Sequence, residues 1–365
     1  MNYFIAFFIA LIISIFGTGI ARRVGMKIGA IRDRHNTKSV PRIGGIAIFL
    51  AFLISTLIML FIFKVDFNFS GLKTFGFDSK FIGIILGGTL IVLAMLFDDL
   101  FELKAWKKLI LQILVVLIVI SSGIGIDFIT NPFGGVIDLN SVYLPLFSIQ
   151  GTLLHFSLWS DLLTLVWLVG MMNVINFIDG IDGLAAGVST IAAFTIFLLS
   201  ISLAVMQPGT AMISIILAGS TAGFLFWNFP PAKIFMGDSG SMFLGFMLGI
   251  LPLISGGKLA TAFLVLGFPI VDGLFVAGGR LLRGKNPLTT PDRTHLHHRF
   301  LAAGFSPRLA VLSLYAIAVA FAWVALRSST SNKIIAAGIL VLLLMAIIFL
   351  LKLRAKRLKC QNFNN

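Results

Sequence analysis

Residues 161–183 read DLLTLVWLVGMMNVINFIDGIDG, an apolar run that ends in a cluster of polar side chains. The apolar part, 161–177, has the length and composition of a membrane-spanning helix. Its end carries four oxygen-bearing side chains within ten residues: Asn173, Asn176, Asp179 and Asp182. A carboxylate costs roughly 2.5–3.5 kcal/mol at the bilayer centre. Groups that expensive, beside an apolar span, predict a polar functional site at a membrane edge.

The rest of the chain is apolar in the same way. It has 365 residues, of which 58% are hydrophobic and only 12% are charged, and its mean hydropathy is +1.05. A soluble domain is about a quarter charged. The apolar runs are also continuous, whereas those of a transmembrane β-barrel alternate. The composition therefore predicts an all-α integral membrane protein, with residues 1–365 forming a single polytopic domain.

Eleven membrane spans are expected, each an apolar run long enough to cross a bilayer. They are 3–20, 43–63, 82–97, 109–126, 161–177, 185–205, 210–227, 240–255, 259–279, 309–326 and 333–351. Most of the 28 Lys and Arg fall in segments that are cytoplasmic if the N-terminus lies outside. The external segment 127–160 carries none, and its turn-rich sequence predicts a hairpin or a re-entrant piece. This distribution predicts an outside N-terminus and a cytoplasmic C-terminus, and it explains the net charge of +14 without a nucleic-acid partner.

The first apolar run can be mistaken for a signal peptide. No basic residue precedes it, and the pair Arg22-Arg23 follows it. We therefore expect it to be retained as the first helix, with its C-terminal end in the cytoplasm. The only cysteine is Cys360, so the sequence predicts no intrachain disulfide.

Two further acidic motifs fall on the same predicted face. Asp98 and Asp99 stand where the third span leaves the membrane, and Asp238 precedes the eighth span in the stretch Gly237-Asp-Ser-Gly-Ser241. The orientation rests on Lys and Arg alone, so this convergence of acids is an independent observation. Carboxylate and amide oxygens suit Mg²⁺ or Mn²⁺, and small residues at a helix N-terminus suit an anion. The motifs together predict a metal that bridges to a phosphate.

Each motif also has a purely structural interpretation. Asp98 and Asp99 could be solvated acids at a helix end, neutralised by a lysine cluster that includes Lys108. Asp182 is well placed to cap the sixth span, and Asp238 could be an ordinary N-cap of the eighth. Four oxygen-bearing side chains in ten residues exceed what caps require, so a functional interpretation is favoured for 173–183.

A fourth motif, Asp292-Arg293-Thr-His295-Leu-His297-His298-Arg299, brings imidazoles and guanidiniums to this face. A zinc site needs a closed ligand set, and no cysteine pair accompanies these histidines. Diphosphate oxygens are better partners for such donors. Upstream, Asn228 and Phe235 offer an amide and an aromatic face to a nucleotide base. Asp272, within the ninth span, either faces this site or pairs with a basic group, and both interpretations stay open.

These motifs resemble those of the polyprenyl-phosphate N-acetylhexosamine-1-phosphate transferases, integral membrane enzymes that begin bacterial cell-envelope polysaccharides. Three family motifs occur in family order: the pair Asp98-Asp99, Asn-x-x-Asn-x-x-Asp-Gly-x-Asp-Gly at 173–183, and Gly-Asp-x-Gly-Ser at 237–241. Members that use a MurNAc-pentapeptide donor carry Pro-Ile-His-His-His where this chain has His295-Leu-His297-His298. The likeness is therefore to the bacterial branch that uses UDP-N-acetylglucosamine. Donors carrying a UDP-linked deoxy-N-acetyl sugar or MurNAc-pentapeptide stay alternatives.

The resemblance implies transfer of GlcNAc 1-phosphate from UDP-GlcNAc to undecaprenyl phosphate, with release of UMP, on the cytoplasmic face of the inner (plasma) membrane. It implies Asp98 and Asp99 as catalytic residues, of which one accepts a proton or forms a covalent phospho-intermediate. Mg²⁺, with Mn²⁺ as the alternative, is expected on Asp238 and Asn176. The expected donor-binding residues are Asn173, Asp179, Asp182, Asn228, Phe235, Arg293, His295, His297, His298 and Arg299. The implied partners are undecaprenyl phosphate, the UDP-sugar and membrane lipid, and a homodimer is compatible with the family.

An ion-coupled transporter is the competing class, because transporters also use intramembrane carboxylates. Their sites usually lie near the bilayer midplane, on broken helices of repeated halves. Here the acids collect at one predicted membrane edge and no internal repeat is evident. The sequence therefore favours a transferase.

Overall fold

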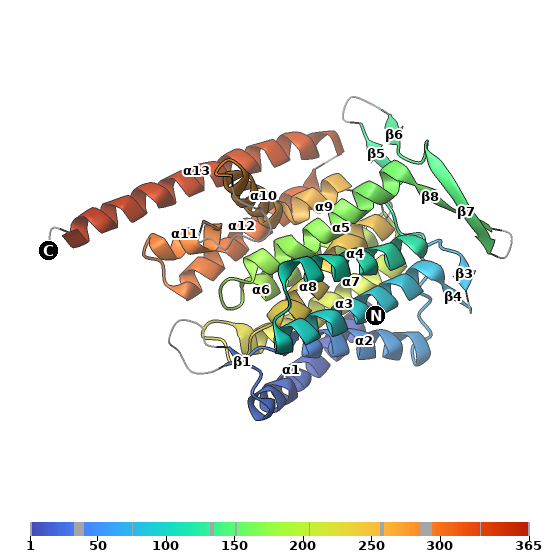
Figure 1. The fold of residues 1–365 in the computed structure, drawn as a ribbon, viewed down its shortest axis with the longest axis horizontal. Helices are drawn as coiled ribbons and strands as arrows, with labels where there is room; N and C mark the ends of the chain where they lie inside the picture. The colour runs from blue at the N-terminus through green and yellow to red at the C-terminus, as the bar shows by residue number, and fades with distance from the viewer. Residues whose placement is uncertain are drawn as a thin grey trace.

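The computed structural model describes residues 2–32, 40–74, 76–131, 135–149, 152–203, 205–255, 259–284, 294–328 and 330–363. Within these ranges the chain is mostly helical, and its long helices run side by side in one bundle (Figure 1). The expected helical class is confirmed.

The helices are given in chain order. The first eight are α1 (Asn2–Ile28), α2 (Gly44–Phe61), α3 (Ser79–Phe101), α4 (Ala105–Ser121), α5 (Leu158–Ile178), α6 (Leu184–Ile201), α7 (Pro208–Asn228) and α8 (Gly237–Ile254). The others are α9 (Leu259–Val265), α10 (Gly267–Leu281), α11 (Leu296–Ala302), α12 (Pro307–Arg327) and α13 (Thr330–Phe363).

The strands of the described ranges form short antiparallel hairpins between helices. The pairs are β1 (Ile31–Arg32) with β2 (Val40–Pro41), β3 (Lys73–Thr74) with β4 (Phe77–Asp78), β5 (Phe128–Thr130) with β6 (Val136–Asp138), and β7 (Tyr143–Ile149) with β8 (Thr152–Ser157). The last two pairs lie in 127–160, so the hairpin expected there is confirmed.

Nine helices of the described ranges are long and apolar enough to cross a membrane: α1, α2, α3, α5, α6, α7, α8, α12 and α13. Of the other two expected spans, 109–126 corresponds to α4, which has 17 residues. The expectation of a single helix over 259–279 is wrong, because α9 ends and α10 begins within it. Pro269 explains the break, since its ring excludes the carbonyl of Val265 four residues earlier. The count of eleven crossings and the orientation of the termini stay predictions.

α8 is the most deeply buried of the spanning helices. It packs against α2, α3 and α5. Its Phe243 meets Phe49 and Phe52 of α2 edge to face, with ring centroids 5.4 and 5.6 Å apart. Close packing of this kind holds helices together in lipid, where apolar burial alone gives little driving force. The first turn of α8, which carries Asp238, is thereby fixed inside the bundle.

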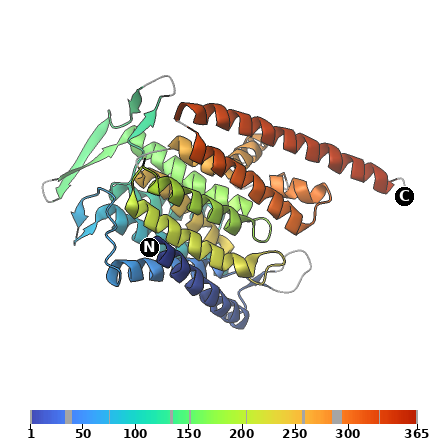
Figure 2. The same ribbon diagram turned by 180° about the vertical axis from the view of Figure 1, so that it is seen from behind.

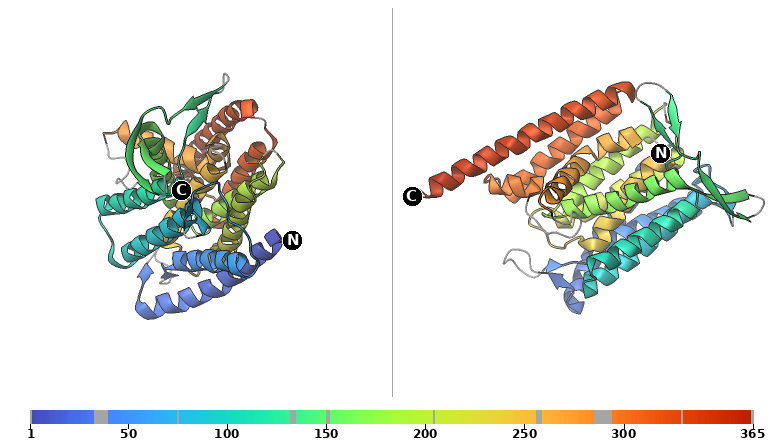
Figure 3. Two further views of the ribbon diagram at one scale, coloured as in Figure 1. Left: turned by 90° about the vertical axis from the view of Figure 1, so that its right-hand side faces the viewer. Right: turned by 45° about the horizontal axis from the view of Figure 1, so that its top comes forward.

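α1 and α13 lie at the periphery of the bundle (Figures 2 and 3). Large apolar side chains such as Phe4 and Phe16 of α1 and Leu342 of α13 are exposed there. α13 has 34 residues and extends past the other helices at its C-terminal end (Figure 3). An exposed apolar surface on outer helices is typical of the lipid-facing side of a membrane protein.

The motifs singled out in the sequence come together at one end of the bundle. The connections α3–α4, α5–α6 and α7–α8 lie at this end with β1, whereas β3 to β8 lie at the opposite end (Figure 1). The polar motifs occupy those connections and the helix ends beside them, so the bundle brings distant parts of the chain to one surface.

Candidate active site

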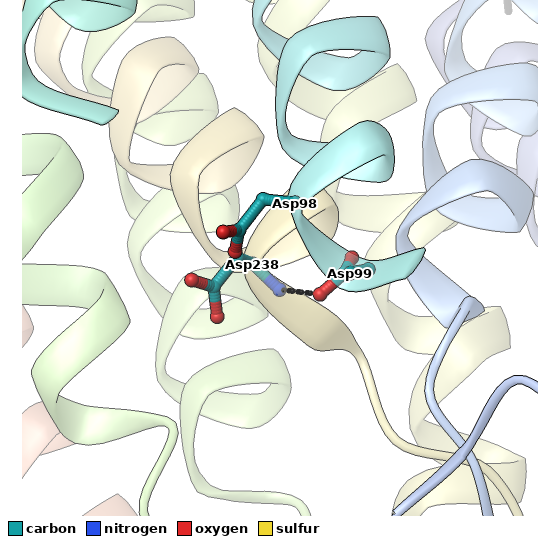
Figure 4. A group of neighbouring side chains, drawn as sticks. All are labelled: Asp98, Asp99 and Asp238. Atoms are coloured by element: carbon teal, nitrogen blue, oxygen red, sulfur yellow. Dashed lines mark hydrogen bonds between the residues drawn. The ribbon is translucent and has the colours of Figure 1, made fainter. Parts of the chain in front are cut away.

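Three carboxylates from two helix ends form a compact cluster. Asp98 and Asp99 lie in the last turn of α3, and Asp238 lies in the first turn of α8 (Figure 4). One oxygen from each lies within 4.8 Å of the others. The side chains are largely buried, with Asp98 only 1% exposed. Burying three like charges together is unfavourable unless cations accompany them.

Two cations lie against this cluster. Lys108 of α4 places its Nζ 2.7 Å from an oxygen of Asp98 and 2.7 Å from an oxygen of Asp238. Arg42, just before α2, lies 2.8 Å from the other Asp238 oxygen and 3.2 Å from Asp99. Burial lowers the pKa of Arg42, but the neighbouring carboxylates outweigh this and hold its pKa above the usual value. Two cations against three carboxylates leave the cluster formally anionic.

Asp99 differs from Asp98 in what its oxygens contact. They accept hydrogen bonds from the backbone N–H groups of Asp238 and Ser239, at 2.8 and 3.0 Å, and from the Ser239 hydroxyl at 2.7 Å. The first N–H groups of a helix have no partner within the helix. Asp99 therefore supplies from α3 the acceptor that α8 needs at its N-terminus. This position suits an anchor between the two helices.

Gly237 makes that approach sterically feasible. Its φ is +75°, a conformation that side-chain-bearing residues rarely adopt. A Cβ at this position would also overlap the carbonyl oxygen of Arg42 and crowd the Asp99 carboxylate. Glycine thus allows α8 to begin directly against the end of α3.

The donor set fits a divalent cation. Hard cations of the Mg²⁺ class prefer carboxylate oxygens, and the formal charge of the cluster is negative. Asp98 and Asp238 both contact the Lys108 ammonium group. The two carboxylates that would hold a metal ion therefore already lie against one positive charge. Asn176 of α5 approaches the same turn of α8, because its Nδ2 donates to the Ser241 hydroxyl at 2.9 Å.

Asn173, one turn before Asn176, contacts a residue that the sequence analysis missed. Its Nδ2 donates to Gln112 Oε1 of α4 at 2.9 Å. Gln112 is buried, and its own amide lies 3.2 Å from the sulfur of Met242 in α8. A lone glutamine inside the apolar span 109–126 is the feature of the sequence that could have found it.

The turn after α5 is fastened to the loop after α7. Asn228 is 2% exposed; its Oδ1 accepts from the Gly183 N–H at 3.0 Å and its Nδ2 donates to Ile234 O at 2.8 Å. Asp182 accepts from the Ala232 N–H at 3.0 Å. The N-cap of α6 is Gly183, so the alternative role of Asp182 as a cap is wrong. These contacts shape the surface where a nucleotide was expected, and the nucleotide-binding role itself stays a prediction.

Asp179 and Phe235 complete the expected nucleotide group. Asp179 is the C-cap residue of α5. Phe235 is 9% exposed, and its backbone bonds to Pro41 O at 2.8 Å and Gly44 N at 3.0 Å. Its main chain therefore ties the α7–α8 loop to the start of α2.

The histidine motif leads into α11. His295 Nδ1 lies 2.9 Å from one Asp272 oxygen, and the Leu296 N–H donates to the other at 2.8 Å. Asp272 thus pairs with an imidazole that is itself one of the expected site residues, so both interpretations left open for it stay open. The rings of His295 and His297 are parallel, with centroids 5.7 Å apart, and His298 tilts against His297 at 4.2 Å.

The histidine motif contains two arginines, Arg293 and Arg299. Arg299 donates through Nε to Thr294 O at 2.6 Å and lies over the ring of Phe275, 5.2 Å from its centroid. Arg293 lies outside the described residues. His297 packs against Gly180 of the α5–α6 turn, so the histidine motif meets the Asn173–Gly183 motif.

Comparison with known proteins identifies the family of this chain. A model of glycosyl transferase family 4 matches residues 81–256. A probable undecaprenyl-phosphate N-acetylglucosaminyl 1-phosphate transferase of Bacillus subtilis is 34% identical over 342 residues, which cover 89% of this chain and 85% of the relative. The chain belongs to glycosyl transferase family 4. The predicted resemblance to the polyprenyl-phosphate N-acetylhexosamine-1-phosphate transferases of this family is confirmed, and the protein is a multi-pass membrane protein.

Two other family members extend the comparison. The decaprenyl-phosphate N-acetylglucosaminephosphotransferase of Mycolicibacterium smegmatis is 32% identical over 334 residues, covering 84% of this chain and 77% of the relative. The undecaprenyl-phosphate alpha-N-acetylglucosaminyl 1-phosphate transferase of Salmonella typhi is 28% identical over 344 residues, covering 90% and 84%. The similarity thus runs over most of each chain.

Proposed function

We propose that this protein transfers an N-acetylhexosamine 1-phosphate, GlcNAc 1-phosphate first among the candidates, from a UDP-sugar to undecaprenyl phosphate. UMP is released and a cell-envelope polysaccharide begins on its lipid carrier. The observation that carries the proposal is the buried cluster of Asp98, Asp238 and Lys108 at one end of a membrane bundle, in a chain of this family. The names of relatives that cover most of this chain support the same reaction.

The reaction needs charge neutralisation more than proton transfer. An oxygen of the lipid phosphate attacks the phosphorus attached to the sugar, and the bond from that phosphorus to the bridging oxygen of UMP breaks. A phosphate monoester has its second pKa near roughly 6, so the attacking oxygen is largely ionised at neutral pH. Phosphoryl transfer then depends on positioning and on stabilising the spread charge. Asp98, which lies beside Asp238 and Lys108 in the cluster, would accept the residual proton of the acceptor.

The two cationic side chains of the site, Lys108 and Arg42, would stabilise the negative charge of the diphosphate. Lys108 and Arg42 are fixed by the carboxylates, so both are in place before the substrate arrives and need no reorganisation. Asp98, Asp238 and Asn176 are the residues that would hold Mg²⁺, which supplies Lewis-acid neutralisation of the diphosphate when bound. The imidazoles of His295–His298 and the guanidinium of Arg299 would bind the remaining diphosphate and sugar oxygens.

The site is proposed to face the cytoplasm of the inner membrane. Three features support this: the Lys and Arg bias of the connections at the site end, the lack of any Lys or Arg in 127–160, and the cytoplasmic supply of nucleotide sugars. If α4 and the pair α9–α10 also cross, there are eleven crossings and the termini lie on opposite sides.

The decisive test uses the full chain purified in detergent with undecaprenyl phosphate, UDP-[¹⁴C]GlcNAc and Mg²⁺. We expect UMP release together with butanol-extractable label, abolished by EDTA and restored by added Mg²⁺. A panel of UDP-sugars, including deoxy-N-acetyl sugars and MurNAc-pentapeptide, measures donor choice. No extractable label beside an active control enzyme would refute the substrate, and uptake into liposomes without UMP release would support a transporter instead.

Gly180→Ala is expected to lower turnover by roughly 10- to 100-fold, because a Cβ there would overlap the buried ring of His297 and displace the histidine motif. UMP release measures the effect. Gly170→Ala, within the preceding helix α5 and with no atom near its Cβ, is the control and should keep wild-type turnover. Equal activity of the two variants would show that the contact between Gly180 and His297 does not matter to the reaction.

A further inference from the structure

A groove of about 730 Å³ opens between α10, α11 and the peripheral helix α13. Its apolar wall includes Phe275 of α10 with Met345 and Phe349 of α13, and its polar end includes Arg299 of α11 with Lys352 and Lys356 of α13. We call it the α13 groove. Its volume lies within the roughly 300–1,000 Å³ range of ligand pockets.

The side chains that line the groove change from apolar to cationic along α13. Met345, Phe349, Lys352 and Lys356 are spaced by four, three and four residues, so they share one face of the helix. This stripe is apolar for its first two members and cationic for its last two. The rise of an α-helix makes it about 16 Å long, close to the roughly 15 Å of one leaflet of the hydrocarbon core. The order and the length fit a lipid that lies along the helix, with its chain against the apolar half.

Charge favours an anionic headgroup at the polar end. Lys352 and Lys356 are exposed, and no residue lining the groove is acidic. The sequence contains neither Asp nor Glu from residue 293 to residue 365. Each Lys near an anionic leaflet contributes about 1 kcal/mol of attraction. A zwitterionic headgroup would gain much less from these lysines.

We propose that the α13 groove binds an anionic phospholipid of the bilayer, with its phosphate between Lys352 and Lys356 and an acyl chain against Phe349 and Met345. One wall of the groove is α13, which lies at the periphery of the bundle, where bilayer lipid is available (Figure 3). None of the three clustered carboxylates, Asp98, Asp99 and Asp238, lines the groove. Arg299 lines the groove and is also assigned to the donor in the proposed reaction, whereas Lys352 and Lys356, which hold the lipid phosphate here, have no role in that reaction.

Native mass spectrometry of the full chain tests this, with phosphatidylglycerol and phosphatidylcholine as the probes. Wild-type protein should retain phosphatidylglycerol in preference to phosphatidylcholine. K352Q/K356Q should lower the affinity for phosphatidylglycerol roughly tenfold or more. The matched control R354Q/R357Q removes two charges from the same turns of α13 outside the groove, and should change it less than about twofold.

Two further arms separate the groove from general surface charge and from the acceptor. Ala302→Trp fills the groove without altering charge and should also lower phosphatidylglycerol retention. Undecaprenyl phosphate in excess should not displace phosphatidylglycerol, and K352Q/K356Q should keep the wild-type KM for undecaprenyl phosphate. Equal losses in K352Q/K356Q and R354Q/R357Q, unchanged retention in Ala302→Trp, displacement by undecaprenyl phosphate, or a raised KM for it would each overturn the proposal.

Discussion

Asp238→Asn is expected to lower kcat for UMP release by roughly 10³-fold, with the fold retained. The carboxylate contacts Lys108 through one oxygen and Arg42 through the other. Asparagine keeps the shape but removes the charge, so the two cations lose their shared anion and a divalent cation loses a hard ligand. The start of α8 should survive, because Asp99 binds the backbone N–H of residue 238 and not its side chain.

The measurement is UMP release at saturating substrates, with the thermal midpoint of the purified protein as the test of folding. Glu102→Gln is the matched control: it removes one negative charge from the end of the same bundle, one turn after Asp98, at an exposed side chain. It should keep wild-type kcat. Asp98→Asn should behave like Asp238→Asn, since both carboxylates share Lys108. Wild-type rates in both Asp variants would remove the cluster as the reacting site.

The acids of the site could be predicted from the sequence because their setting is local. Asp98 and Asp238 each stand at the edge of an apolar span, where a charge is costly and therefore conspicuous. Their cations could not be assigned in the same way. Lys108 and Arg42 stand 130 and 196 residues from Asp238, and in the sequence each is one basic residue among several near it. Only the packing of α2, α3, α4 and α8 selects them.

Two other differences between the sequence-based predictions and the structure have distinct physical causes. Asp182 has the local pattern of a helix cap, but a donor distant in the chain, the Ala232 N–H, takes its oxygen. No rule based on neighbouring residues could find that partner. The break between α9 and α10 is the opposite case, because it lies just before Pro269, a residue that disfavours a continuous helix. The hydropathy of 259–279 predicts one continuous span, whereas Pro269 in the same stretch already indicates a break.

The role of Asn228 cannot be assigned from the sequence alone. In the sequence its amide is a plausible partner for a base. In the fold the same amide holds Gly183 on one side and Ile234 on the other. An Asn228 variant that loses activity would therefore report on the shape of two loops as well as on any substrate contact. For this reason the sharpest experiments use Asp98, Asp99 and Asp238, whose contacts differ enough to separate their roles.

Asp99→Ala is expected to destabilise the protein by about 3–5 kcal/mol, as removal of one partner of a buried ion pair does. The change leaves the Arg42 guanidinium without one of its two carboxylates. It also leaves the N–H groups of Asp238 and Ser239 and the Ser239 hydroxyl without their acceptor. Buried donors that lose an acceptor each cost roughly 1–3 kcal/mol.

The thermal midpoint in detergent measures this loss, and Asp99→Asn should fall between the wild type and Asp99→Ala because one acceptor oxygen remains. Glu102→Ala, at an exposed side chain of the same helix end, should keep the wild-type midpoint. The comparison also decides between the two roles considered for Asp99. A variant that is inactive yet as stable as the wild type would make Asp99 a reacting group, as the sequence predicts. A large loss of stability would make it the anchor that joins α3 to α8 and keeps Asp98 and Asp238 together.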